Sequence, residues 1–313
     1  MSMIVGQFKT PPRNWLAFEL NVLRRFTFRS AAIPLAHDGA LGSYLKRWDA
    51  RVSANSPLQS IWAKCQARLP NNSEKLSADD VNTVLEDAYV PGYKLRNASL
   101  RNWFSETDSW WFDNVRASIE NLPTPVSRAI AVNIAMAVGD YVLSFNDETM
   151  ELRQPLSNVF RRIWTTEPDP INNGQNNTAH NKIAEEFIAE SQAELMFLKL
   201  PRAHPQATRS FLGRTAWREE WVRGGAEFWN DYDSMLAGKL GSATETKSQY
   251  LHVLQETLRT AGHIRTWVIA HTEDGFISTQ DLLDSIRTVR RLDRIFTKDF
   301  SDLTGAKAVI ITA

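Results

Sequence analysis

Short apolar runs alternate with longer amphipathic segments along most of this chain. Apolar runs bounded by turn residues predict buried strands, whereas apolar positions that recur every three or four residues predict helices. After the first 30 residues, which are irregular to helical, the two patterns follow one another in a strand–helix rhythm. The predicted strands cover residues 31–36, 50–55, 194–200, 265–271, 292–298 and 308–313.

The predicted helices lie between these strands and in a long central segment. A serine followed three positions later by an aspartate predicts helix starts at Ser77 and Ser105, with the helices reaching about residues 88 and 121. The segment 126–145 is apolar on almost every side, which predicts a deeply buried helix. Further helices are predicted over residues 41–48, from Pro57 onwards, and over 181–191, 209–235, 247–261 and 279–289.

This order of elements predicts an α/β fold with a Rossmann-like, mostly parallel sheet, an antiparallel terminal strand and a helical insertion. Residues 1–69 and 166–313 would form the α/β domain, and residues 70–165 the insertion. The turn-rich stretch 165–180 predicts a loop beside a cleft. Target recognition and dimerisation both remain open as roles for the insertion.

The composition narrows the classes of protein to consider. The 36 basic and 36 acidic residues cancel, so any contact with nucleic acid must come from local clustering of charge. The single cysteine, Cys65, excludes a disulfide framework, and we interpret it as a core thiol. The six histidines lack helical i, i+4 pairs, so we expect no metal site. We find no signal-peptide pattern and no long uninterrupted apolar run, and therefore expect a cytoplasmic protein that does not contact membranes.

The stretch from Glu194 to Arg202 is the most informative motif, because it combines a buried strand with a tight turn. It resembles the catalytic strand of the Dam-like family of adenine-specific DNA methyltransferases, which ends in Asp-Pro-Pro-Tyr. The same four positions are Lys199, Leu200, Pro201 and Arg202 here. A lysine offers hydrogen-bond donors but no acceptor for the target amino group, and it adds positive charge where positive charge develops in the transition state. The resemblance therefore implies an inactive relative without catalytic residues.

Other segments resemble the same family in the same order, and they depart from it at positions that would bind S-adenosylmethionine. The family's glycine-rich turn after the first strand falls on residues 35–39, where His37 stands in place of the first glycine and Gly39 is kept. The family's ribose-binding acid maps to Ser56, and an aspartate near the cofactor's adenine maps to Lys182. The segments 103–121, 173–187 and 268–278 also resemble family patterns. The resemblance thus implies that this chain binds no cofactor.

Basic residues gather around the altered strand end and after it. One interpretation is that these basic residues form a solvated face, with Glu219 and Glu220 as acidic neighbours. We favour contacts with DNA phosphates, because this face points toward DNA in the family. Eleven tryptophans favour core packing over base stacking. The residues expected to contact double-stranded DNA are Lys199, Arg202, Arg209, Arg214 and Arg218.

Three functions follow from these patterns. The first is an inactive methyltransferase-like subunit that supports DNA binding by an active DNA adenine methyltransferase in a heterodimer, with S-adenosylmethionine bound by that partner. A restriction-modification or related system would be its setting. The second is an active methyltransferase with atypical motifs. The third is a stand-alone DNA-binding or structural module.

Overall fold

A computed structural model describes residues 14–146, 148–273, 276–301 and 306–313 of the chain. Its centre is a seven-stranded sheet in the order β3-β2-β1-β4-β5-β7-β6. Six strands run in the same direction, and β7 is antiparallel to both of its neighbours. The strands are β1 (Ser30–Ile33), β2 (Arg51–Asn55), β3 (Thr178–His180), β4 (Leu195–Lys199), β5 (Thr266–Glu273), β6 (Arg294–Asp299) and β7 (Lys307–Thr312).

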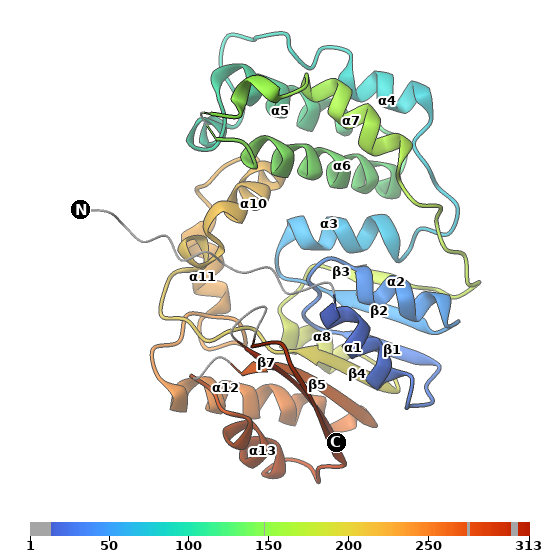
Figure 1. The fold of residues 1–313 in the computed structure, drawn as a ribbon, viewed down its shortest axis with the longest axis vertical. Coiled ribbons are helices and arrows are strands. Elements are labelled where there is room, and N and C mark those ends of the chain that lie inside the picture. The colour runs from blue at the N-terminus through green and yellow to red at the C-terminus, as the bar shows by residue number, and fades with distance from the viewer. Residues whose placement is uncertain (1–13, 147, 274–275, 302–305) are drawn as a thin grey trace.

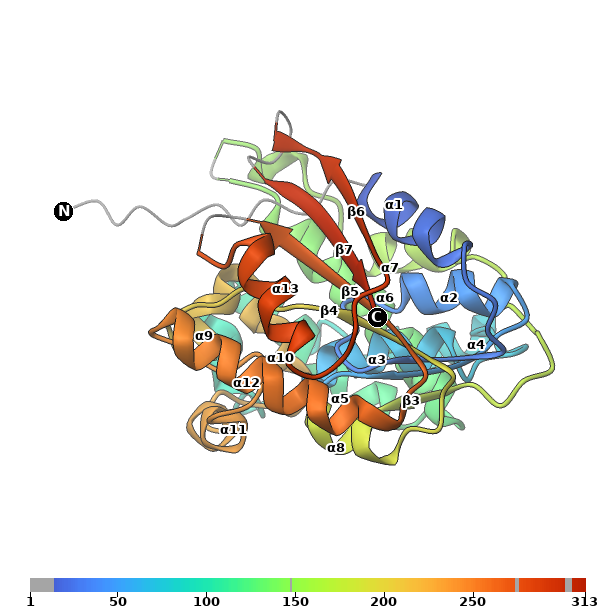
Figure 2. The same ribbon diagram turned by 90° about the horizontal axis from the view of Figure 1, so that it is seen from below.

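Helices cover both faces of the sheet, so the α/β part has three layers (Figures 1 and 2). On one face, α1 (Asn14–Leu23), α2 (Ala40–Arg47) and α3 (Gln59–Arg68) pack on apolar residues of β1, β2, β4, β5 and β7. On the other face lie α8 (Ala184–Glu190), α12 (Lys247–Thr260) and α13 (Thr279–Arg287). The strands that are buried on both faces are almost wholly apolar, as in Leu195–Lys199.

A second, helical lobe stands beyond α3 (Figure 1). It contains α4 (Ala78–Leu85), α5 (Glu106–Ile119), α6 (Pro125–Leu143) and α7 (Leu156–Thr165). Its core also takes residues from α3 and from α10 (Ala216–Arg223), so the two lobes share a packed boundary. The remaining helices are α9 (Thr208–Leu212), α11 (Trp229–Leu236) and the 3-10 turns Ala98–Asn102, Met150–Leu152, Gly213–Thr215 and Ala261–His263.

Helix α6 is the centre of this lobe. Pro125 occupies its first turn and Thr124 caps it, which is the start that a proline favours. At Gly139 the helix meets Trp217 of α10 so closely that an added Cβ would lie 2.2 Å from the indole. In length and apolar character α6 could cross a membrane, yet 61% of its apolar window is buried inside the fold. Its hydrophobicity is thus accounted for by core packing.

The structure confirms the predicted α/β class and the mostly parallel sheet with an antiparallel terminal strand. Several local predictions were wrong. The short strand β3 lies in the predicted loop 165–180, and α7 was not predicted as a separate helix. Helix α3 begins at Gln59 instead of Pro57. The helical region predicted over 209–235 consists of several short helices, with breaks at Gly213 and Gly224, both of which have positive φ.

Candidate functional site

The carboxyl ends of the parallel strands are the first place to look for a site. The chain passes from β1 to β2 on one side and to β4 on the other, so the strand order reverses between β1 and β4. Ligands of open α/β sheets bind at such a switch point. The structure brings the sequence-selected positions to this edge: the turn with His37 and Gly39 follows β1, Ser56 follows β2, Lys182 follows β3, and Lys199 ends β4.

The end of β4 is closed by the N-terminal helix. The Lys199 ammonium lies 2.8 Å from Oε1 of Glu19 on α1, and the side chains are only 18% and 5% exposed. The same ammonium lies 5.1 Å from the ring centre of Trp15, which itself stacks on Phe300. Burial raises the pKa of Glu19, and the neighbouring Lys199 lowers it in part. A buried ion pair thus occupies the strand end to which the resemblance assigned a catalytic aspartate.

The residues after Lys199 are packed as well. Leu200 is buried, and the carbonyl of Pro201 accepts a hydrogen bond of 2.8 Å from the Tyr250 hydroxyl. The cavity between Pro201, Tyr250 and His271 has a volume of about 10 Å³. A space of this size holds at most one water molecule. In this conformation that cavity therefore has no room for a nucleotide base.

The turn after β1 is shaped to start α2. The Asp38 carboxylate accepts a hydrogen bond of 2.9 Å from the Ala40 amide, and Gly39 adopts a left-handed conformation with φ of 75°. His37 is exposed to solvent but lies in dense protein surroundings. Desolvation and the positive charge of Lys199 lower its pKa to about 4, against the opposing effect of Asp38. Because this imidazole still contacts water, desolvation acts on it less than on a fully enclosed ring.

Asn55, at the end of β2, ties three strand ends together. Its fully buried side chain donates to the carbonyls of Pro34 and Lys182, at 2.9 and 3.0 Å, and accepts from the Lys182 amide at 2.9 Å. No sequence motif singled out Asn55. The signal was an asparagine at the end of an otherwise apolar strand, where a buried amide needs several partners.

The neighbouring polar positions also serve the fold. Ser56 is buried, and its hydroxyl accepts from the Leu58 amide at the start of α3. The Lys182 ammonium pairs with Glu190, the last residue of α8, at 2.5 Å. The position to which the resemblance assigned a ribose-binding acid is thus a serine whose hydroxyl is used within the fold.

Most of the basic residues expected to contact DNA have partners within the protein. Arg218 makes a bidentate pair with Asp140 on α6, with contacts of 2.6 to 3.0 Å. Arg209 pairs with Glu220 at 2.7 Å, and Arg214 donates to the carbonyl of Leu143. Arg202 is exposed on the turn after β4. The structure brings Lys199 and Arg202 together at the sheet edge and places the other three at the lobe boundary. Their contact with DNA stays a prediction.

The two acidic residues considered as neighbours on a solvated face are buried, so that interpretation was wrong for them. Glu219 and Glu220 are 1% and 0% exposed. The Glu219 carboxylate accepts from the Gln59 and Ser60 amides, at 2.8 and 2.9 Å, and so caps the N-terminus of α3. The lobe boundary is therefore held by charge as well as by apolar contacts.

The remaining candidates for chemistry have structural environments. Within the described residues, no three His, Cys, Asp or Glu side chains gather as metal ligands would. Burial raises the pKa of Cys65 to about 12, as expected for a core thiol that does not ionise. Seven of the eleven tryptophans are buried, namely Trp15, Trp110, Trp111, Trp217, Trp221, Trp229 and Trp267.

No protein-family model and no curated protein sequence matches the chain.

Proposed function

We propose that this protein is a catalytically inactive, methyltransferase-like subunit that supports DNA binding by an active DNA adenine methyltransferase. The proposal starts from the resemblance of the strand at 194–202 and of the segments around it. It is supported by the order of the sheet, in which a single reversed strand lies next to the edge of a parallel sheet. It is also supported by the gathering of the altered positions at one sheet edge.

The observation that carries the proposal is the ion pair between Lys199 and Glu19. An adenine methyltransferase needs a hydrogen-bond acceptor and an open base pocket at the end of this strand. Here the position holds a donor, and the donor is neutralised inside the protein beneath Trp15. The Lys199 ammonium itself offers no acceptor to a substrate amine.

The cofactor positions support the same conclusion. The hydroxyl of Ser56 is used in the turn that starts α3, and Asn55 fills the space between the ends of β1 and β3 with its own hydrogen bonds. The two ribose hydroxyls of S-adenosylmethionine would find no carboxylate here. An active partner would therefore supply both the cofactor and the catalytic Asp-Pro-Pro-Tyr strand.

Calorimetry with S-adenosylmethionine tests the loss of the cofactor site. We expect no heat of binding to the isolated chain and no methyl transfer to DNA. The variant Lys199→Asp should also remain inactive, because it restores the acceptor without restoring the cofactor site. Tight cofactor binding by the wild-type chain would overturn the proposal.

Purification from the native host tests the partner. We expect the chain to copurify with a protein that carries an intact Asp-Pro-Pro-Tyr motif, and the pair to methylate adenine in DNA. Recovery of the chain without such a protein, together with binding of DNA by the chain alone, would favour the stand-alone module instead.

A further inference from the structure

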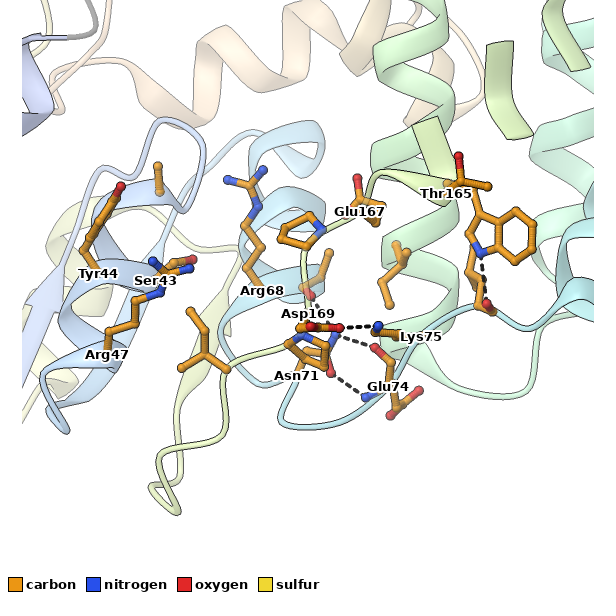
Figure 3. A pocket seen from close by; sticks show the side chains of 18 residues that line it. Ser43, Tyr44, Arg47, Arg68, Asn71, Glu74, Lys75, Thr165, Glu167 and Asp169 are labelled. Carbon is orange, nitrogen blue, oxygen red and sulfur yellow. Dashed lines mark hydrogen bonds and ion pairs between the residues drawn. The ribbon is translucent and has the colours of Figure 1, made fainter. Parts of the chain in front are cut away.

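A second pocket lies at the boundary of the two lobes, away from the strand ends (Figure 3). Its volume is about 440 Å³, which is within the usual range for small-molecule sites. Helix α2 and the end of α3 form one wall, and the end of α7 and the segment 167–171 form the other. None of the altered methyltransferase positions lines it. This pocket is therefore independent of the site discussed above.

A buried lysine shapes the wall at the end of α3. The Lys46 ammonium is fully buried and donates to the carbonyls of Leu69 and Asn71, at 2.8 and 2.6 Å, with a longer contact of 3.4 Å to that of Arg68. A helix carboxyl end carries partial negative charge, which would repel an anion. The Lys46 ammonium offsets that negative charge, although Lys46 itself does not line the pocket. Burial lowers its pKa to about 8, while the carbonyl contacts favour the charged form.

Two arginines contribute positive charge to the pocket. Arg68 donates from Nη1 to the carbonyl of Asp38 at 3.2 Å, and within the described residues it makes no ion pair. Arg47 is exposed, and its guanidinium lies 5.4 Å from the ring centre of Tyr44. Both guanidinium groups keep donors that could bind an anion.

Glu167 contributes the opposite charge. Its side chain is half-buried, and in the described part of the chain its carboxylate has neither a hydrogen bond nor an ion pair. Burial raises the pKa of Glu167, with Arg68 acting in the other direction. Three further charged residues of the lining have partners. Lys75 pairs with Asp169, and the Glu74 carboxylate accepts a hydrogen bond from the Thr124 hydroxyl. Figure 3 shows Arg68 and Glu167 pointing toward the same part of the pocket, away from the Lys75–Asp169 pair.

We propose that this pocket binds a nucleotide whose base carries an exocyclic amino group, with the phosphate on Arg47 and Arg68 and the amino group on Glu167. Guanidinium groups bind phosphate through paired hydrogen bonds, and a carboxylate accepts from a base amino group. Tyr44 and Trp164 provide aromatic surface in the wall. A free nucleotide and a nucleotide within a single strand share this chemistry.

Calorimetry with three matched ligands tests the proposal on the full chain. Adenosine monophosphate should bind. Adenosine, which lacks the phosphate, and purine riboside monophosphate, which lacks the amino group, should each bind at least about tenfold more weakly, as expected for the loss of about 1.4 kcal/mol. A trinucleotide of deoxyadenosine, run alongside, distinguishes a strand from a free nucleotide as the natural ligand.

Variants assign each contact. Arg68→Met should reduce the affinity for adenosine monophosphate to that for adenosine, and Arg47→Met provides a second test that leaves the contact with Asp38 intact. Glu167→Gln should bring the affinities for adenosine monophosphate and purine riboside monophosphate closer together. Arg101→Met is the control, because Arg101 is exposed and lies outside the pocket.

The proposal is overturned if neither the mononucleotide nor the trinucleotide binds at millimolar concentration while circular dichroism shows the chain to be folded. It is equally overturned if binding is unchanged in both Arg68→Met and Arg47→Met. Failure of these experiments would leave the methyltransferase-like proposal untouched, because that proposal depends on S-adenosylmethionine and on a partner.

Discussion

The end of β4 and the lobe-boundary pocket both contain charged groups in partly buried positions, but they differ in how these charges are satisfied. At the end of β4, the ammonium of Lys199 meets the carboxylate of Glu19. In the pocket, within the described residues, Glu167 and Arg68 have no ion-pair partner. Burying an ion costs less when a counter-ion is already present in the fold. The end of β4, to which the resemblance assigns catalysis, is therefore closed by a buried ion pair, whereas the lobe-boundary pocket keeps charges without a counter-ion among the described residues.

The largest expected effect on stability comes from removing one partner of the Lys199–Glu19 ion pair at the end of β4. Lys199→Met leaves the Glu19 carboxylate buried without its counter-ion, and we expect a loss of about 3 kcal/mol in the free energy of unfolding. Urea denaturation measures this loss. The double variant Glu19→Gln, Lys199→Met removes both charges and should recover more than half of it. A single variant as stable as the wild type would show that the ion pair does not hold α1 against the sheet.

A somewhat smaller effect is expected at the wall of the open pocket. Lys46→Met leaves the carbonyls of Leu69 and Asn71 without their donor, which should cost about 2 kcal/mol. The same variant should weaken binding of adenosine monophosphate, because the negative end of α3 is no longer offset. Arg47→Met, one position along and exposed, should change stability by less than about 0.5 kcal/mol. Equal stabilities of the two variants would contradict the role of Lys46.

The strand ends give a third test. Asn55→Ala removes the hydrogen bonds that join the ends of β1, β2 and β3, and we expect a loss of about 1.5 kcal/mol. The exposed Asn176 offers the control Asn176→Ala, which should leave the denaturation midpoint unchanged. If the loss at Asn55 is no larger than in the control, the amide does not hold the strand ends.

The smallest effect concerns pH. The folded protein lowers the pKa of His37 from 6.5 to about 4, so between these values the unfolded chain binds more protons than the folded chain. The contribution of His37 to the free energy of unfolding should therefore increase as the pH rises from 4 to 6.5. Above pH 6.5 this contribution should be constant. Lys199 and Asp38 act on the same ring, and the raised pKa of Glu19 works in the opposite sense over part of the range.

The variant His37→Gln isolates the contribution of the histidine. The difference in stability between wild type and variant, measured by thermal unfolding at several pH values, should change between pH 6.5 and 4 and be constant above 6.5. A difference that is constant throughout would mean that the imidazole has the same pKa in the folded and unfolded chains.

Much of the fold could be predicted because its elements have strong local patterns. The apolar run at 194–200 and the serine caps at Ser77 and Ser105 specify their own strand and helices. Strand β3 could not be predicted in this way, since its three residues are half-buried and it is held by pairing with β2. A strand of that length has no periodicity of its own.

The candidate site was predicted only in outline. The positions after β1, β2 and β4 meet at one edge, as the strand–helix order implied, and the unpredicted strand β3 adds Lys182 to them. Their partners could not be predicted from sequence. Asn55 joins two other strand ends, and the pocket at the lobe boundary combines α2 with the segment 167–171, more than a hundred residues later in the chain.

The alternation of strands and helices, the apolar core and the presence of a hydrogen-bond donor at residue 199 follow from the sequence alone, because each depends on residue types and their spacing. Which charged groups have an ion-pair partner depends on the tertiary packing. Lys199 pairs with Glu19, which lies 180 residues away in the sequence, and Arg218 pairs with Asp140, which lies 78 residues away. The energy of a charged group depends on its burial and on its nearest counter-ion, and both are set only when distant segments pack together.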